Sequence, residues 1–352
     1  MSETTLLPTL DSLRKQLAIP VANTGQKMSL FGHRGGPVVD DIEGLHAIAD
    51  PQGHVRLLSG IEFAMQLYRG QTHEYPSCTP TLARLVSIEQ QLLALCRRIA
   101  FEDTIGEHPM VKLAEKIKLF DLPLYIDREG LAQHYGLATD MLDVTSNFDV
   151  ASFFASCSWN NNLRKYEPFT DNGKVGVIYR ITPALMIEME RPDEPFGPVH
   201  IVGWQPLPRP EQQRAFVVKI QSGQDFTSLP TVETFRFLQQ SHISQRVWQT
   251  FEHGNVLFPQ EAAAEVSRQA ESLTSFTQSQ IEQAWQRLCK WTETTYGSSQ
   301  KEQTQLNAGI TLTEELPLTW EGLGIETSED RLMEQFKEVV DRVRYRIASY
   351  KK

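Results

Sequence analysis

The 352-residue chain lacks the residue patterns that mark several common classes of protein. Its four cysteines form no Cys-x-x-Cys pair, which argues against a disulfide framework and against the usual structural zinc sites. No uncharged apolar run approaches 18 residues, so no membrane-spanning helix is expected. Walker loops, His-Glu-x-x-His and Gly-x-Ser-x-Gly motifs are also missing. These absences predict a cytoplasmic protein without a metal centre.

The chain also has fewer basic than acidic residues. The chain has 34 Lys and Arg against 44 Asp and Glu, which gives a net charge of -10. This balance disfavours a broad electrostatic footprint on nucleic acid, although a local basic groove stays open. Hydrophobic residues make up 40%, enough for a substantial core. The length predicts either one large domain with an appendage or two domains.

The most informative stretch covers residues 131–155, which we expect to form a helix, a turn, a strand, a turn and a second helix. Alternation along the strand places Asp143 and Thr145 on the same face. Ser146 is expected to begin the second helix, with Asp149 three residues later completing a capping box. The N–H groups at such a strand-to-helix junction can hold anionic or polar ligand atoms. We therefore expect a binding site here.

The same residues also allow simpler structural roles. His134 next to Gly136 fits a cation at a helix C-terminus beside a left-handed cap, with Tyr135 packing inward. Ser146 could serve only as a helix N-cap. Asp143 is harder to explain in this way, because a carboxylate in an apolar strand costs free energy unless it is paired. It either anchors a loop or belongs to a site.

A known family matches this pattern of residues. Residues 133–145, Gln-His-Tyr-Gly-Leu-x-Thr-x-x-Leu-Asp-x-Thr, and the following Val-Ala-x-Phe-Phe-Ala resemble the core signature of the FRG domain. Tyr-Arg-Gly-Gln at residues 68–71 is similar to the Phe-Arg-Gly motif of that family, and the resemblance covers about residues 60–260. Three positions depart from the family pattern: Tyr68 replaces Phe, Asp140 replaces Arg and Val144 replaces Trp.

A more distant resemblance concerns the order of three polar elements. An Arg at an early strand, a Thr-Ser pair at a strand-to-helix junction and a Glu-Gln pair at a late strand resemble the triad of the ADP-ribosyltransferase fold. That resemblance implies NAD as a substrate and no metal. It implies catalytic roles for Arg69, Thr145 and Gln212. It further implies that the residues binding NAD are Arg69, Gly70, His134, Tyr135, Asp143 and Ser146.

The two resemblances together imply an NAD-dependent ADP-ribosyltransferase that acts on nucleic acid or protein, as a toxin or a phage-defence effector. Gln212 at the key position is no general base, which leaves transferase activity open. The alternative is a non-catalytic module that binds a ligand or another protein. A third hypothesis is a hydrolase that uses His134 and Asp143.

The expected fold is α+β: a mixed sheet of short strands with buried helices, like the ADP-ribosyltransferase fold, followed by a helical C-terminal extension. We divide the chain into a loosely attached arm over residues 1–30, an FRG-like domain over 31–260 and the extension over 261–352. The arm carries a short helix, Leu10–Leu17. In the extension, the predicted helix 328–350 has an apolar stripe that packs on the domain or on a partner protein.

Two buried helices are expected inside the domain, over residues 82–100 and 147–158. In the first of them Glu89 interrupts an apolar stripe that includes Val86, and a carboxylate there needs a cation. Arg69 is the expected partner of Glu89. The guanidinium of Arg69 would retain further donors for a ligand.

Overall fold

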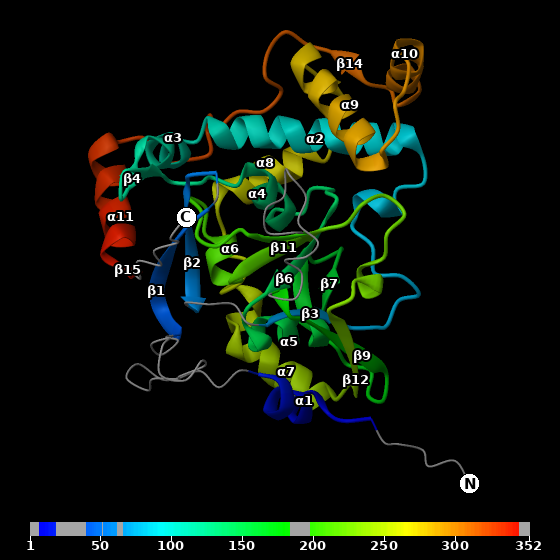
Figure 1. The fold of residues 1–352 in the computed structure, drawn as a ribbon, viewed down its shortest axis with the longest axis vertical. Helices are drawn as coiled ribbons and strands as arrows, with labels where there is room; N and C mark the ends of the chain where they lie inside the picture. Colours follow the sequence, from blue (N-terminus) through cyan, green and yellow to red (C-terminus); the bar gives the residue numbers. More distant parts are fainter. Residues whose placement is uncertain (1–6, 19–39, 51, 62–65, 184–197, 345–352) are drawn as a thin grey trace, which may run out of the picture.

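The computed structural model describes residues 7–18, 40–50, 52–61, 66–183 and 198–344. Its central feature is a six-stranded sheet with the order β10-β11-β6-β3-β9-β12, in which all neighbouring strands are antiparallel (Figure 1). In chain order its strands are β3 (Leu67–Gln71), β6 (Met141–Thr145), β9 (Val175–Ile181), β10 (Val199–Ile201), β11 (Ala215–Lys219) and β12 (Val232–Leu238).

Smaller sheets surround this one. A three-stranded sheet joins β1 (Asp40–Ala49) and β2 (Val55–Ile61) to β15 (Val343–Arg344), which pairs with β1 in parallel. Three two-stranded sheets are β4 (Lys118–Leu119) with β5 (Leu122–Pro123), β7 (Cys157–Asn160) with β8 (Lys165–Pro168), and β13 (Ser275–Phe276) with β14 (Thr311–Leu312).

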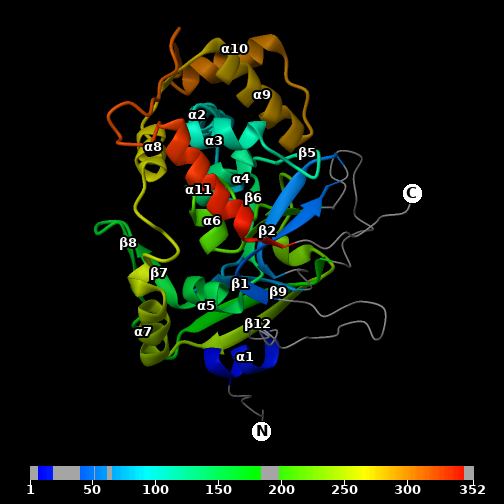
Figure 2. The same cartoon turned by 90° about the vertical axis from the view of Figure 1, so that its left-hand side faces the viewer.

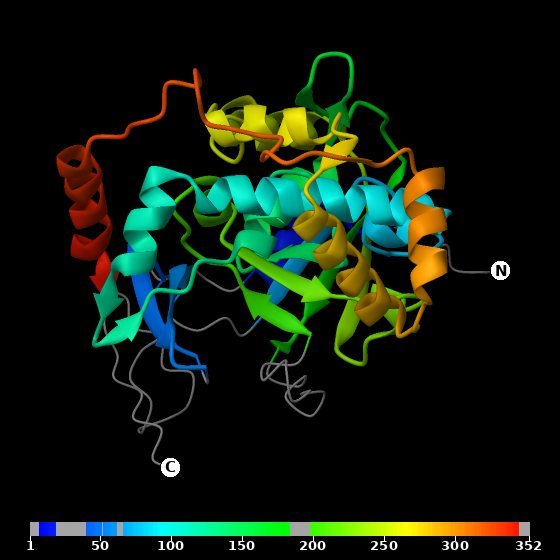
Figure 3. The ribbon, with the colours of Figure 1, turned by 90° about the horizontal axis from the view of Figure 1, so that it is seen from above.

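Helices lie on two sides of the central sheet. Figure 2 shows one group at the lower end of the molecule: α1 (Leu10–Leu17), α5 (Phe148–Ser156) and α7 (Ser241–Thr250). A second group forms a helical layer above the sheet, seen across the molecule in Figure 3: α2 (Ile88–Gly106), α4 (Arg128–His134), α8 (Ala262–Ala270) and α9 (Gln278–Thr292). The remaining helices are α3 (Pro109–Lys116), α6 (Arg209–Gln212), α10 (Ser298–Asn307) and α11 (Glu329–Asp341).

Apolar residues alternate along β6 and so bury different faces of the strand. Leu142 and Val144 lie in one core cluster with residues of β9 and β11, whereas Met141 lies in another. Val150 and Phe153 of α5, with Cys157 directly after the helix, pack on Leu257, as their helical spacing predicts. The α+β class and the helix–turn–strand–turn–helix order around β6 are therefore confirmed.

The helix predicted over residues 82–100 is displaced along the chain. It begins at Ile88, because Ser87 and Gln90 form a capping box that satisfies N–H groups of the first turn. Val86 precedes the helix and is 95% exposed, so the predicted stripe is wrong at its start. The face that packs into the core carries Leu92, Cys96 and Ile99. Glu89 lies in the first turn and not inside an apolar stripe.

Helix α1 is packed against the domain, unlike the loose attachment expected for residues 1–30. Leu10, Leu13 and Leu17 are all buried, in one cluster with residues of α5 and β12. The Tyr68 hydroxyl donates a hydrogen bond of 2.6 Å to the Leu17 carbonyl. The division of the chain near residues 30 and 260 stays a prediction.

The last predicted helix is shorter than residues 328–350. It ends at Asp341, and β15 follows it, because Val343 and Arg344 pair with Leu45 and His46 of β1. Residues 345–352 lie outside the described part of the chain. Leu332 and Phe336, the first members of the apolar stripe, are buried against the molecule itself. Of the two occupants expected for this stripe, the domain is therefore the one observed.

The described residues contain no helix with the length and apolar character that crossing a bilayer requires. The same residues contain no group of His, Cys, Asp and Glu side chains arranged to hold a metal ion.

Candidate functional site

The polar residues singled out in the sequence meet where β3 and β6 separate. The two strands pair at Tyr68 and Thr145, which is the pairing that their register shows. Next to this pair, Arg69 Nη1 reaches across and donates to the Asp143 carbonyl at 2.8 Å. The structure thus brings Arg69, Asp143 and Thr145 together, as expected, whereas their roles stay predictions.

His134, at the end of α4, faces the Asp143 side chain. The Gln213 amide donates through Nε2 to the Leu257 carbonyl at 3.0 Å, so its oxygen is turned toward His134 Nδ1 at 2.9 Å. Nδ1 therefore carries the ring proton of neutral His134. His134 Nε2 lies 3.6 Å from Asp143 Oδ1, and this approach is attractive when Nε2 is also protonated. The His134 side chain is 1% exposed and that of Asp143 is 37% exposed, so the carboxylate is the part of the pair that is open to solvent.

Two further residues, which the sequence analysis did not single out, orient the carboxylate of Asp143. Gln133 Nε2 donates to Asp143 Oδ2 at 2.9 Å. The Thr139 hydroxyl donates to the Gln133 side-chain oxygen and accepts from the Met141 backbone N–H at 3.1 Å. We call these side chains the polar cluster: Gln133, His134, Thr139, Asp143, Thr145 and Gln213. Hydrogen bonds join Gln133, Thr139 and Asp143 in one group and His134, Thr145 and Gln213 in another. The 3.6 Å approach of His134 to Asp143 brings the two groups together.

Gln212, the predicted catalytic residue, is not part of the polar cluster. It is exposed at the end of α6. The next residue, Gln213, is buried, and its backbone carbonyl accepts a hydrogen bond of 2.7 Å from the Thr145 hydroxyl. At the end of the single turn of α6, Gln212 points outward and Gln213 points inward. The residue that contacts Thr145 and His134 is therefore Gln213, one position after the glutamine predicted from the sequence. Two adjacent glutamines gave no signal in the sequence that distinguishes them.

Ser146 does not cap α5. The cap is Asn147, whose side-chain oxygen accepts from the backbone N–H groups of Asp149 at 2.7 Å and Val150 at 3.4 Å. The Ser146 hydroxyl is buried and has no hydrogen-bond partner among the described residues. Because the capping role falls to Asn147, the hydrogen-bonding capacity of the Ser146 hydroxyl is not used by the helix.

Gly70 allows a close backbone approach, but the approaching backbone belongs to α5. A Cβ at Gly70 would lie 1.9 Å from the Ala151 carbonyl oxygen and 2.7 Å from the Ala155 nitrogen. Any side chain at this position would push α5 away from β3. The structure therefore explains Gly70 by packing and assigns it no contact with the polar cluster.

Arg69 does not pair with Glu89, contrary to the sequence-based expectation. The pKa of Glu89 lies below its usual value because of hydrogen bonds from its own backbone N–H and from Ser87. Arg69 Nε is buried without a hydrogen-bond partner, and no carboxylate among the described residues pairs with its guanidinium. Burial is the main cause that lowers the pKa of Arg84, and the nearby positive charge of Arg69 lowers it further. Among the described residues neither guanidinium has an acidic partner, and two such neighbouring groups favour an anion.

Aromatic residues and the guanidinium of Arg209 lie beside the polar cluster. The rings of Tyr166 and Phe258 stack with centroids 4.8 Å apart. The guanidinium of Arg209 lies 4.5 Å from the ring centroid of Tyr135 and 5.6 Å from that of Phe258. Burial is the main cause that raises the pKa of Tyr166, and the nearby charge of Asp143 adds to it. The aromatic pair therefore adjoins the carboxylate of the polar cluster.

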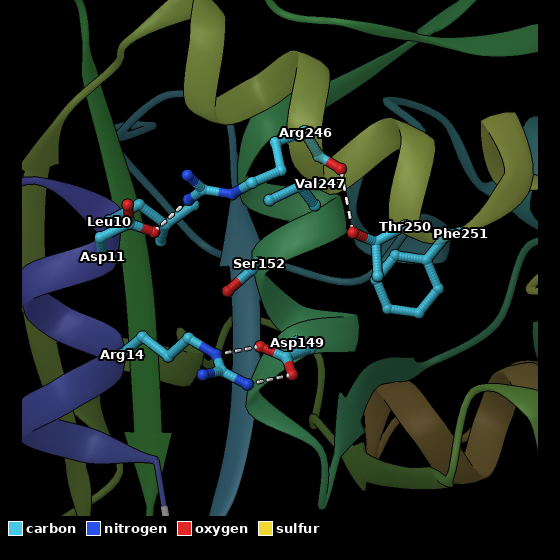
Figure 4. Close-up of a pocket in the computed structure, with 9 residues that line it drawn as sticks. All are labelled: Leu10, Asp11, Arg14, Asp149, Ser152, Arg246, Val247, Thr250 and Phe251. Atoms are coloured by element: carbon cyan, nitrogen blue, oxygen red, sulfur yellow. Dashed lines mark hydrogen bonds and ion pairs between the residues drawn. The ribbon is translucent and has the colours of Figure 1, made fainter.

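A cavity of about 300 Å³ lies elsewhere, between α1, α5 and α7 (Figure 4). Arg14 and Asp149 form an ion pair on one side of it, with Nε and Oδ1 2.6 Å apart, and Arg246 pairs with Asp11 on the other. None of its lining residues belongs to the polar cluster, so the two features are separate: Leu10, Asp11, Arg14, Asp149, Ser152, Arg246, Val247, Thr250 and Phe251.

The three departures from the FRG pattern have structural counterparts. Asp140 accepts from Arg98 Nη1 at 3.2 Å, and Arg98 is fully buried among acidic side chains, so a carboxylate suits this position. Tyr68 uses its hydroxyl to hold Leu17 of α1. Val144 is buried in the core of the sheet. None of the three belongs to the polar cluster.

Comparisons with known proteins give one match. The model of the FRG domain family matches residues 65–163, which include β3, α2, α4, β6 and α5. Searches of curated proteins and of solved structures found no match. Within the matched segment lie Arg69, His134 and Asp143, whereas Gln213 lies beyond it. On this match and on the signature residues gathered around β6, residues 65–163 of the chain form an FRG domain.

Proposed function

We propose that this FRG-domain protein is an NAD-dependent ADP-ribosyltransferase that modifies a nucleic acid or a protein. The observation that carries the proposal is the position of Arg69. Its guanidinium has no carboxylate partner among the described residues, and it bridges to the strand that bears Asp143. A fixed cation beside a pair able to transfer a proton suits a phosphate-bearing substrate.

Arg69 and Arg84 would hold the pyrophosphate of NAD. Arg69 offers its Nε, which has no hydrogen-bond partner among the described residues, as part of a planar group that binds phosphate oxygens in pairs. Arg84 is tied through Nη2 to the Thr81 hydroxyl at 3.0 Å, which limits its rotamers. The Ser146 hydroxyl, which has no partner among the described residues, would contact the nicotinamide ribose.

The reaction needs one bond to break and one to form. The C1′–N bond between ribose and nicotinamide breaks, and neutral nicotinamide leaves with the bonding electrons. A nucleophilic oxygen or nitrogen of the acceptor then bonds to C1′ and releases its proton. Asp143 Oδ1, backed by His134 Nε2 at 3.6 Å, would take up that proton. The carboxylate also stabilises the positive charge that develops at C1′.

This assignment gives the reaction a general base other than Gln212. A glutamine at the late strand cannot act as a general base. In the structure its neighbour Gln213 accepts from His134 Nδ1 at 2.9 Å. In the proposed reaction Asp143 and His134 would take the proton instead. Gln213 is then a positioning residue.

A second candidate function, hydrolysis, is favoured by the same His134–Asp143 approach. With water as the nucleophile, the products of NAD would be free ADP-ribose and nicotinamide. A non-catalytic binding module is the remaining alternative, and it predicts binding without products.

Product analysis separates these functions. Purified protein is incubated with NAD labelled in the adenylate part, together with cell RNA, DNA and protein as acceptors. We expect release of nicotinamide and transfer of the label to a macromolecule. Release with all label in free ADP-ribose would instead support hydrolysis. Binding of NAD, seen as a raised melting temperature, without release would support the binding module.

The proposed biological use is that of a toxin or an antiviral effector. Expression of the protein in a bacterial host should then slow growth, and Asp143→Asn should relieve this effect at equal protein level. Equal growth inhibition by both forms would contradict the proposed use.

A further inference from the structure

We infer that Glu261 is a positioning residue for His134 and acts through Arg209, so that the site extends beyond the matched FRG segment. The inference rests on the proposed function for what His134 does in the reaction. Its structural content, a physical link from Glu261 to His134, stands independently of that function.

The link begins at the C-terminal end of α4. Arg209 Nη1 donates to the His134 carbonyl at 3.4 Å, and the guanidinium lies over the ring of Tyr135 at 4.5 Å. A cation at this end of the helix also interacts favourably with the helix dipole. The Ser267 hydroxyl of α8 donates to the Tyr135 carbonyl at 2.6 Å. Residues far along the chain therefore hold the backbone from which His134 projects.

Glu261 holds Arg209 from the other side. Its Oε1 lies 3.6 Å from Arg209 Nε, and the side chains are only 13% and 15% exposed. The distance exceeds that of a hydrogen bond, and both atoms lack a hydrogen-bond partner among the described residues. The buried Tyr135 hydroxyl also faces Glu261, and its interaction with the carboxylate lowers the pKa of Glu261. The position of Arg209 therefore depends mainly on attraction by the Glu261 charge and on aromatic contact.

That charge changes near neutral pH. Burial raises the pKa of Glu261 to about 7, although Tyr135 and Arg209 both act in the opposite direction. Arg209 of α6 and Tyr135 of α4 are the groups that face it from the neighbouring elements. When Glu261 is protonated, its attraction for Arg209 is lost. The end of α4 then loses part of its support.

The same segment supports the His134 ring directly. Leu257, four residues before Glu261, accepts from the Gln213 amide whose oxygen faces His134 Nδ1. A shift of the 257–261 segment would therefore reach His134 by two routes, through its backbone carbonyl and through its ring. The C-terminal part of the chain is thus an integral support of the polar cluster.

The experiment is an NMR titration of the full chain from about pH 5.5 to 8.5. The signals followed are the His134 ring protons and the Tyr135 backbone N–H. In the wild-type protein both should report a transition with a midpoint near the pKa of Glu261, about 7. Glu261→Gln should remove that transition from the Tyr135 N–H and move the His134 ring signals. Glu261→Asp, which keeps a carboxylate, should restore the transition in part.

Glu265→Gln is the matched control. Glu265 lies in the first turn of α8 and pairs with the exposed Arg268, so its loss should leave both signals as in the wild-type protein. Wild-type-like titrations in Glu261→Gln would overturn the inference. So would a transition lost equally in Glu265→Gln.

Kinetics supply a second arm. Glu261→Gln should lower kcat for NAD by about 10- to 100-fold with little change in KM, because misplacement of a reacting group by about 1 Å has such an effect. Unchanged kcat in an active protein contradicts the inference. If the wild-type protein does not turn over NAD, the proposed function fails, whereas the NMR arm still decides the link from Glu261 to His134.

Discussion

His134 Nε2 and Asp143 Oδ1 lie 3.6 Å apart, and the hydrogen bond of His134 Nδ1 to Gln213 turns the Nε2 lone pair toward the carboxylate. The lone pair of Nε2 and the carboxylate oxygen therefore face each other across this distance. In the proposed reaction, this arrangement would take up a proton from the nucleophile and release it without a change of rotamer. It links a strand-borne carboxylate that is partly exposed to a histidine that is buried.

Asp143→Asn should reduce turnover of NAD by at least about 100-fold, the lower range for loss of a general base. The amide keeps the shape and an oxygen that can accept from Gln133, so the melting temperature should change little. Single-turnover kinetics and thermal denaturation measure both effects. Asp149→Asn, at an ion pair beside the separate cavity, is the control that should retain activity. Full activity of Asp143→Asn would exclude the proton-transfer role.

The stability of the protein should depend on pH through Glu261. Its pKa of about 7 in the folded chain is raised from the ordinary 4.5, so the folded state binds more protons between these values. The stabilisation is complete below about pH 4.5 and is lost as the pH rises through 7. Glu261→Gln should remove this dependence and should raise the free energy of unfolding at pH 8 by about 1–3 kcal/mol. Urea denaturation at several pH values measures this free energy. The same dependence of the free energy of unfolding on pH in both proteins would refute the prediction.

Gly70→Ala should destabilise the fold by about 2 kcal/mol or more. The added methyl group would meet the Ala151 carbonyl oxygen at 1.9 Å, and backbone atoms of α5 and β3 must move apart. Gly297→Ala is the matched control, because its nearest neighbour, Ser299 Oγ, is 4.0 Å away. Chemical denaturation should separate the two variants clearly. Equal stability would show that α5 does not pack on β3 as described.

Tyr68→Phe restores the residue typical of the FRG pattern and removes one hydroxyl. The Leu17 carbonyl then loses its donor at 2.6 Å, which should cost about 1–2 kcal/mol. Hydrogen exchange of the α1 backbone should become faster than in the wild-type protein. Tyr75→Phe, at a ring that is 52% exposed, should leave exchange in α1 unchanged. Unaltered exchange in Tyr68→Phe would mean that the hydroxyl does not hold α1.

The sequence predicted best what depends on local periodicity. Alternation in β6 places Asp143 and Thr145 on one face, and the spacing on α5 predicts its buried side. The errors arose where two adjacent residues are equally suited to the same structural role. Ser146 and Asn147 are both good N-caps, and the geometry of the turn selects Asn147. Gln212 and Gln213 differ only in the direction in which α6 turns them.

Long-range contacts were beyond the reach of sequence patterns. Glu261 lies more than a hundred residues from His134, and its place beside Arg209 depends on how α6 and α8 pack. The parallel pairing of Val343 with Leu45 of β1 ends a segment whose spacing alone predicts a longer helix. Arg69 met Asp143 as expected, whereas its expected partner Glu89 is used at the start of α2.

The most direct test of the account compares Arg69→Ala with Arg236→Ala in one assay of labelled NAD. Both arginines lie on strands of the central sheet, but Arg236 is paired with Glu74 at the surface, whereas Arg69 has no acidic partner among the described residues. We predict that Arg69→Ala stays folded, with NAD binding and nicotinamide release lost, and that Arg236→Ala behaves like the wild-type protein. A folded Arg69→Ala that binds and cleaves NAD normally would contradict the account.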